Sequence, residues 1–272
     1  DLIITPFQYE FMWRALIGST LVGLVCAVFS CFLVVKGWSL MGDAVSHSVL
    51  PGLALAYIAG WPLILGAFTA GLLCAVLTGY IKDNSRVKED AVLGIMFSGM
   101  FAFGLVLLTK IETEIHLLHV LFGNILGIGW GDIYQIAYIS LPLLAVIAVK
   151  WKDLMMYCFD PSHAKVIGLP VNMLHYGLLI FLSLTIVASL KAAGIILVIA
   201  MLIAPGAIAY LMTSSFSKML FIAIGASLLS CVGGTIASFH LDVATAPLIV
   251  LVQTGLFILA LLFSPGKGIV RI

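Results

Sequence analysis

The sequence predicts an all-α, polytopic membrane protein with eight or nine transmembrane helices and one short cytoplasmic helix. Of its 272 residues, 63% are hydrophobic and only 9% are charged. A typical soluble domain is about 45–50% apolar and about 25% charged. Long apolar stretches also recur along the whole chain, and a spanning helix needs about 20 mostly apolar residues. We therefore expect residues 1–272 to form a single transmembrane domain.

Composition also excludes several other classes of protein. The chain has 13 Lys and Arg against 12 Asp and Glu, so it lacks the basic excess that nucleic-acid binding requires. Intrinsic disorder is excluded as well, because it needs low hydrophobicity and high charge. The expected surroundings are a lipid bilayer. Five cysteines lie in or beside apolar runs and are expected to be free thiols: Cys26, Cys31, Cys74, Cys158 and Cys231.

Nine segments are candidates for membrane spans. They cover residues 11–35, 46–60, 63–81, 91–109, 132–149, 173–190, 193–211, 219–238 and 246–263. The segment 46–60 is the shortest and has a polar start, so it could be half-buried or broken. The number of full crossings is therefore eight or nine.

Basic residues mark the connections that we expect on the cytoplasmic side. The positive-inside rule places loops rich in Lys and Arg in the cytoplasm. The C-terminus then faces inward, and the N-terminus faces outward with nine spans or inward with eight. The basic residues that set this orientation are Lys82, Arg86, Lys88, Lys150, Lys152, Lys165, Lys218, Lys267 and Arg271.

One cytoplasmic connection, from residue 150 to about residue 172, is long enough to hold a short helix. Asp160 is a suitable N-cap and Pro161 a suitable first helical residue. Gly168 and Pro170 would end the helix. Two interpretations remain open: an interfacial loop helix, or a docking helix for a cytoplasmic partner.

Asp43 and His47 are the main candidates for a functional site. Charge at membrane depth is costly and usually functional. Residues four apart share one helix face, so a carboxylate and an imidazole would converge there, and this ligand pair suits Mn²⁺, Fe²⁺ or Zn²⁺. Pro51 has no N–H, so the His47 carbonyl loses its helical partner and could bind a metal or a water. The alternative is a helix start near the interface, with Asp43 as its cap and His47 satisfied locally.

Two weaker groups lie where we expect the outer side. His240 and Asp242 could both reach one ion from a loop, but a polar loop end is the simpler interpretation. The second group is more typical of a solvated loop or a partner-contact surface than of a metal site. It consists of Glu112, Glu114, His116 and His119.

The chain contains no Walker-type phosphate loop, no Gly-x-Ser-x-Gly elbow and no zincin motif. It therefore lacks the means to hydrolyse ATP itself. We expect a transport subunit that is not an enzyme, with any ATP hydrolysis on a separate partner.

The sequence resembles the membrane-spanning permease subunit of bacterial ABC importers for manganese, iron and zinc. The segment Gly42-Asp43-Ala44-Val45-Ser46-His47 is the most specific match. Residues 117–127 and 238–245 are most similar to the manganese/iron branch of that family. The other matching segments are residues 6–12, 37–41, 86–90, 121–127, 168–170 and 194–205.

This resemblance implies the partners and the role of each candidate site. Members of the family pair as dimers in the bacterial cell membrane, dock two cytoplasmic ATPase subunits and receive the ion from an extracytoplasmic metal-binding protein. The implied cargo is Mn²⁺ or Fe²⁺, with Zn²⁺ as a further candidate, and no permanent cofactor is implied. Asp43 and His47 would bind the ion. The helix at 160–170 would be the coupling helix, with docking residues Asp160, Pro161, Ala164, Gly168, Leu169 and Pro170.

Two other classes of protein remain as alternatives at the level of sequence. In a gradient-driven secondary transporter or a channel, Asp43 and His47 would form a proton relay. Such transporters often contain inverted repeats, and no convincing repeat relates the two halves of this chain. An intramembrane enzyme would need a nucleophile or a dense metal motif within the spans, and none is visible. Strict dependence of transport on a separate ATPase separates the importer from both.

Overall fold

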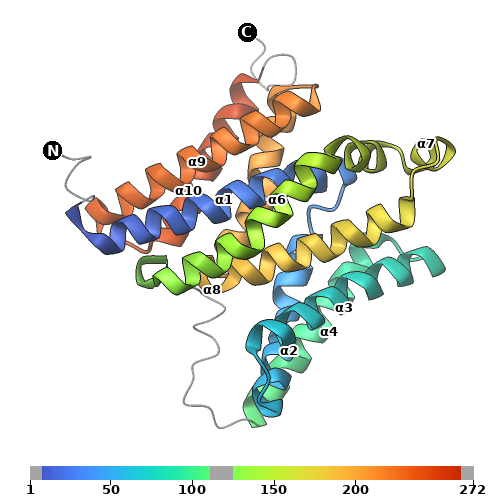
Figure 1. Cartoon of the computed structure of the whole chain (residues 1–272), viewed down its shortest axis with the longest axis horizontal. Helices are drawn as coiled ribbons and strands as arrows, with labels where there is room; N and C mark the ends of the chain where they lie inside the picture. The colour runs from blue at the N-terminus through green and yellow to red at the C-terminus, as the bar shows by residue number, and fades with distance from the viewer. Residues whose placement is uncertain (1–7, 111–124, 265–272) are drawn as a thin grey trace.

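The computed structural model describes residues 8–110 and 125–264, and over these residues every regular element is a helix (Figure 1). The predicted all-α fold is therefore confirmed. The outer-loop candidates Glu112, Glu114, His116 and His119 lie outside the described residues, as do Lys267 and Arg271. The elements are α1 (Glu10–Lys36), α2 (Met41–Ala59), α3 (Leu63–Asn84), α4 (Glu89–Lys110), the 3-10 turn η2 (Ile125–Gly127), α6 (Trp130–Phe159), α7 (Pro161–Val166), α8 (Val171–Met212), α9 (Phe216–Leu241) and α10 (Thr245–Phe263).

Eight helical segments within the described residues are long and apolar enough to cross a membrane. The element α8 supplies two of them, Val171–Leu190 and Ala192–Met212. Between the two spans Gly194 has a φ of 73°, which a residue with a side chain rarely adopts. Figure 1 shows the yellow first half and the orange second half of α8 running in different directions. The predicted segments 173–190 and 193–211 are therefore two spans joined at one bend.

The remaining predicted segment, 46–60, corresponds to the last part of α2 and its C-cap, Gly60. Helix α2 is not among those eight spans, but it continues as a helix through Pro51. Lys36 at the end of α1 and Lys82 near the end of α3 line one cavity with Tyr157 of α6 and Asn172 of α8. The ends of α1 and α3 therefore lie at the same, basic face of the molecule. The chain has to cross back through α2 before α3 can return. The structure thus favours nine passes, with α1 starting at the outer face.

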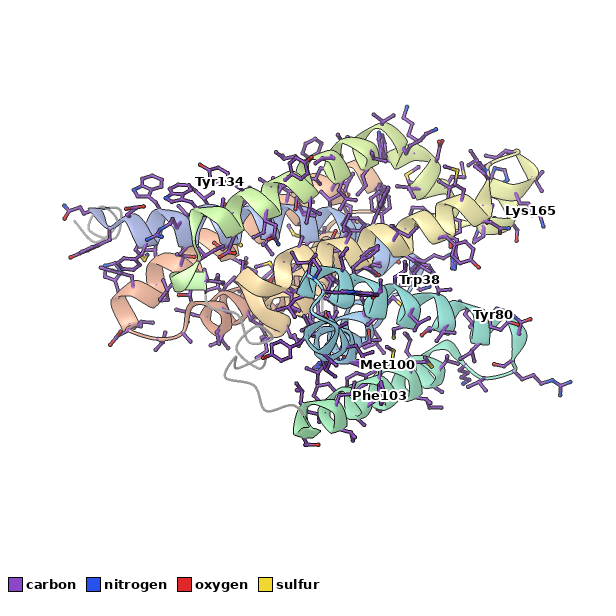
Figure 2. All side chains as sticks on the ribbon, turned by 60° about the horizontal axis from the view of Figure 1, so that its bottom comes forward. Trp38, Tyr80, Met100, Phe103, Tyr134 and Lys165 are labelled. Carbon is purple, nitrogen blue, oxygen red and sulfur yellow. The ribbon has the colours of Figure 1, made fainter. Side chains whose placement is uncertain are left out.

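Figure 1 agrees with this orientation, because the start of α1 and the short helix α7 lie at opposite ends of the molecule. Tyr80 of α3 and Lys165 of α7 lie together at the inner end (Figure 2). The central element is α1, because 72% of its apolar spanning segment is buried inside the protein. The buried share of the spanning segment is only 17% in α4 and in α10. In Figure 1 α2, α3 and α4 form a group on one side of the molecule, and α2 carries the main candidate site.

The five cysteines are all buried and free, as predicted. Their thiols serve as small core groups. Cys231 Sγ, for example, donates to the carbonyl of Ser19 on α1 at 3.2 Å. This is the ordinary behaviour of a free cysteine inside a packed protein.

Ser30 of α1 hydrogen-bonds to the backbone of α8 on both sides of Pro205. Pro205 has no N–H and interrupts the ladder of α8. The Ser30 hydroxyl accepts from the N–H of Gly206 at 2.7 Å and donates to the carbonyl of Ile203 at 3.1 Å. Side chains of neighbouring helices help membrane helices to tolerate proline, because they bond backbone groups around the interruption.

We expect Ser30→Ala to destabilise the protein by about 1–3 kcal/mol, because it leaves buried backbone groups without partners. Thermal unfolding of the purified chain in detergent measures the effect as a lower Tm. Ser230→Ala is the matched control, since the Ser230 hydroxyl donates to the carbonyl of Ala226 within its own helix. Equal Tm values for the two variants would contradict the role given to Ser30.

Candidate metal site

Helix α2 brings Asp43 and His47 together as the sequence predicted. His47 Nε2 lies 3.3 Å from Asp43 Oδ1, one helical turn away. The N-cap of α2 is Leu40 and has no side-chain capping bond, so Asp43 does not serve as the cap. The structure thus favours the shared-face interpretation of this pair over the capping alternative.

The local hydrogen bonding of α2 leaves these two side chains available. The neighbouring hydroxyls are satisfied within the helix: Ser46 Oγ donates to the carbonyl of Gly42 at 2.7 Å, and Ser48 Oγ donates to that of Val45 at 2.8 Å. His47 Nδ1, in contrast, is buried and has no hydrogen-bond partner in the described part of the chain. A buried polar atom without a partner is uncommon in proteins, and a ligand or a water can account for it.

The side chains of Asp43 and His47 are accessible from outside the chain, although neither is fully exposed. The Asp43 side chain is 36% exposed and that of His47 is 25% exposed. Pro51 lies inside α2 and cannot donate to the His47 carbonyl, as expected from the sequence. At this level α4 approaches closely, because a Cβ added at Gly104 would lie 2.8 Å from the Pro51 nitrogen.

Two phenylalanines of α4 hold the His47 ring. The centroids of Phe97 and Phe101 lie 4.9 and 5.3 Å from that of His47, and both contacts are edge-to-face. Such contacts are favourable between aromatic rings and fix the orientation of the imidazole. Sequence reasoning missed both residues. Their only signal is a spacing of four on an apolar helix, which does not show that this face meets α2.

The described part of one chain supplies only part of a metal site. Over residues 8–110 and 125–264, no group of three or more His, Cys, Asp or Glu side chains could hold an ion. Asp43 and His47 are therefore two candidate ligands, whereas a bound transition metal commonly has four or more. Carbonyls, water or a second copy of the chain would have to complete the coordination.

The secondary candidates, His240 and Asp242, form the end of a helix. Asp242 is the C-cap of α9, with φ 51° and ψ 47°, and His240 Nδ1 lies 3.0 Å from the carbonyl of Ile236. Both side chains are exposed. No ion pair within the described residues joins them, and no metal-binding group unites them with Asp43 and His47.

The helix predicted in the cytoplasmic connection is α7, and its ends match the sequence signals. Asp160 Oδ1 accepts from the N–H of His163 at 2.9 Å, and Pro161 is the first helical residue. Gly168 then has a φ of 84°, which suits glycine, and the N–H of Leu169 donates to the carbonyl of Ala164 at 3.0 Å. The short helix α7 is therefore capped at both of its ends.

The exposed face of α7 differs in part from the predicted docking set. Ala164 is fully buried, so it packs inward rather than toward a partner. Val166 and Ile167 were missed by the sequence analysis, although they are 84% and 51% exposed. Val166 is the last residue of α7 and Ile167 its C-cap, so these two exposed aliphatic side chains are adjacent and lie outside the spans.

The comparisons with known proteins agree with this architecture. The sequence model of the ABC 3 transport family matches residues 8–264. The chain is 58% identical over 269 residues to the chelated iron transport system membrane protein YfeD of Yersinia pestis, covering 99% of this chain and 91% of that protein. It is 52% identical over 267 residues to the manganese transport system membrane protein MntB of Synechocystis, covering 98% and 87%. Among solved structures, PsaBC from Streptococcus pneumoniae in complex with Fab superimposes with a TM-score of 0.87 and 36% identity, covering 98% of this chain and 96% of that one.

Proposed function

Since the chain belongs to the ABC 3 transport family, we propose that it is the permease of an ATP-driven importer that moves Mn²⁺ or Fe²⁺ into the bacterial cytoplasm. It is a multi-pass membrane transport protein with eight apolar spans in its described part. Relatives at 58% and 52% identity are named for iron and for manganese transport. The observation that carries the proposal within this chain is the Asp43–His47 contact on α2.

Asp43 and His47 act as the ligands of the passing ion. The carboxylate lowers the cost of bringing a divalent cation into a low-dielectric region. The imidazole supplies a nitrogen ligand, and Phe97 and Phe101 keep its ring beside the carboxylate. A set of nitrogen and oxygen ligands without sulfur suits Mn²⁺ and Fe²⁺, and it also binds Zn²⁺.

Two copies of the chain build the complete site. Each described chain offers a pair of ligands and no third His, Cys, Asp or Glu beside it. Homodimers are commonly two-fold symmetric, and such a dimer would bring two Asp43–His47 pairs to one axis and so provide four ligands. Binding there is weak enough to permit release, because passage requires the ion to leave as well as to enter.

A cytoplasmic ATPase drives the change of access through α7, and an extracytoplasmic metal-binding protein delivers the ion. The chain has no phosphate-binding loop of its own. The ATPase contacts the exposed apolar side chains of Val166 and Ile167 at the inner face. The family match favours this ATP-driven class over the gradient-driven carrier or channel.

Uptake by reconstituted vesicles tests the proposal. Vesicles hold this chain, its ATPase and its metal-binding protein, and accumulation of radioactive Mn²⁺ is followed with ATP or with a non-hydrolysable analogue. We expect uptake only with ATP, and competition by unlabelled Fe²⁺. Uptake without ATP that follows an imposed proton gradient would contradict the importer and favour the carrier.

The docking role of α7 leads to a separate prediction. Val166→Asp should reduce the amount of ATPase that co-purifies with the chain at least about tenfold, because it places a charge in an apolar contact. The Tm of the isolated chain should not change, since Val166 is 84% exposed. Val166→Leu, which keeps the contact apolar, is the control. Full retention of the ATPase by Val166→Asp would place the docking surface elsewhere.

A further inference from the structure

An apolar groove of about 500 Å³ lies between α6 and α9. Helix α1 forms its floor, because α1 packs against both of these helices, whereas α6 and α9 have almost no close backbone contact with each other. In Figure 1 blue α1, green α6 and orange α9 lie away from the group formed by α2, α3 and α4. The lining consists of Leu24, Val28, Leu144, Ile147, Ala148, Trp151, Ser217, Leu220, Phe221 and Ile224.

The groove opens toward the lipid in the inner half of the membrane. Its lining uses the second half of α6 and the first half of α9, and these are the halves near the inner face. Every lining side chain except that of Ser217 is apolar or aromatic, and Phe221 is 78% exposed. From Leu144 to Trp151 the wall is about 10 Å long, at 1.5 Å per residue. If the groove stayed empty, its walls would lose their dispersion contacts.

Aromatic and basic side chains mark the inner end of the groove. The Trp151 ring stacks on the ring of Phe216, with 6.3 Å between centroids and 6° between planes. Tryptophan is enriched at the headgroup level of membranes. Lys152 Nζ lies 5.8 Å from the centre of the Trp151 ring. On α9 the exposed Lys218 directly follows Ser217, which lines the groove. Two ammonium groups therefore flank the inner end.

The start of α9 adds hydrogen-bond donors at the same place. Its N-cap, Ser215, makes no side-chain capping bond, and the N–H groups of Ser217 and Lys218 donate to no acceptor in the described part of the chain. Such a helix start favours an anion. The neighbouring carboxylate on α6, Asp153, is paired with Lys150 at 3.2 Å. The inner end of the groove is thus suited to a phosphate group.

We propose that one acyl chain of an anionic phospholipid from the inner leaflet lies in this groove, with its phosphate held by Lys152, Lys218 and the first turn of α9. Basic sites between membrane helices on the cytoplasmic side suit such headgroups. The choice of a lipid over a second copy of the chain rests on the proposed function, which places the partner copy at Asp43 and His47 on α2.

Thermal unfolding of the full chain in a neutral detergent measures the binding, because a ligand that binds only the folded state raises the Tm. Short-chain phosphatidylglycerol, short-chain phosphatidylcholine and inorganic phosphate are titrated separately. We expect phosphatidylglycerol to raise the Tm far more than the other two, since only phosphatidylglycerol combines acyl chains with a net negative headgroup. The proposal fails if phosphatidylcholine or inorganic phosphate gives an equal shift.

Ala148→Phe tests the position of the acyl chain. Ala148 is exposed and lines the groove, so the larger side chain extends into it without entering the core. We expect phosphatidylglycerol affinity to fall at least about tenfold, because exclusion of about two buried CH₂ groups already costs that much. Ala260→Phe is the matched control, since Ala260 lines a different apolar groove between α8, α9 and α10. Equal affinities of the two variants would overturn the site.

The double variant Lys152→Gln, Lys218→Gln tests the position of the headgroup. It should lower phosphatidylglycerol affinity about tenfold, because each lysine near an anionic lipid contributes about 1 kcal/mol. Lys88→Gln with Lys165→Gln is the control, since both of these lysines are exposed and neither adjoins the groove lining. An equal loss in both double variants would mean general attraction to basic residues and would refute the headgroup site.

Light scattering identifies the competing occupant, a second copy of the chain. If Ala148→Phe turns a dimer into a monomer and leaves phosphatidylglycerol affinity unchanged, the groove is an interface between copies and the lipid proposal is wrong. Asp43→Ala should leave lipid binding unchanged, because Asp43 lies on α2, outside the groove. Loss of metal uptake and loss of lipid binding are therefore separate results, and either proposal can fail without the other.

Discussion

Replacement of Asp43 by alanine is expected to lower ATP-dependent Mn²⁺ uptake at least about 100-fold, because losing even a group that only supports a metal ligand typically costs about 10–100-fold. The substitution removes the carboxylate that offsets the cost of a divalent cation in a low-dielectric region. It also leaves His47 as the only metal-binding side chain of its pair. Initial rates of Mn²⁺ uptake in vesicles with the ATPase and the metal-binding protein measure the effect.

The complex should still assemble, since the Asp43 side chain is 36% exposed and caps no helix. Glu10→Ala is the matched control: Glu10 also faces a basic side chain one turn away, with 3.8 Å between its Oε1 and Arg14 Nε, but lies at the outer end of α1. Uptake that survives Asp43→Ala in an intact complex would move the ion path elsewhere. His240 and Asp242 would then be the next residues to replace.

The features that the sequence predicted correctly depend on local patterns. Apolar stretches of sufficient length located the spans, and the signals around Asp160 and Gly168 located both ends of α7. The spacing of Asp43 and His47 placed them on one face of α2, because residues four apart on a helix are neighbours wherever the helix packs. None of these inferences requires knowledge of how the helices meet.

The features that sequence reasoning missed depend on contacts between distant segments. Phe97 and Phe101 meet His47 only because one face of α4 packs on α2. Ala164 is buried because α7 folds back onto its neighbours, and a pattern of six residues does not show which side is covered. The choice between eight and nine passes likewise needed the ends of α1 and α3 to be placed at one face.

Gly52→Ala is expected to be the most damaging small substitution in the described part of the chain. Gly52 of α2 and Gly66 of α3 face each other so closely that a Cβ added to either would overlap the backbone carbonyl of the other. Small residues allow membrane helices to approach in this way. Backbone cannot move aside as a flexible side chain can, so we expect a loss of about 3 kcal/mol. The Tm in detergent should fall by about 6–12 °C.

Gly94→Ala is the control for Gly52→Ala, because a Cβ added at Gly94 has nothing within 4 Å. Alanine is the better helix former, so that variant should keep or slightly raise the Tm. Gly52→Ala should also reduce Mn²⁺ uptake although Asp43 and His47 are unchanged, since the α2–α3 contact positions the helix that carries them. A variant with normal Tm and normal uptake would show that α2 and α3 can separate without disturbing the site.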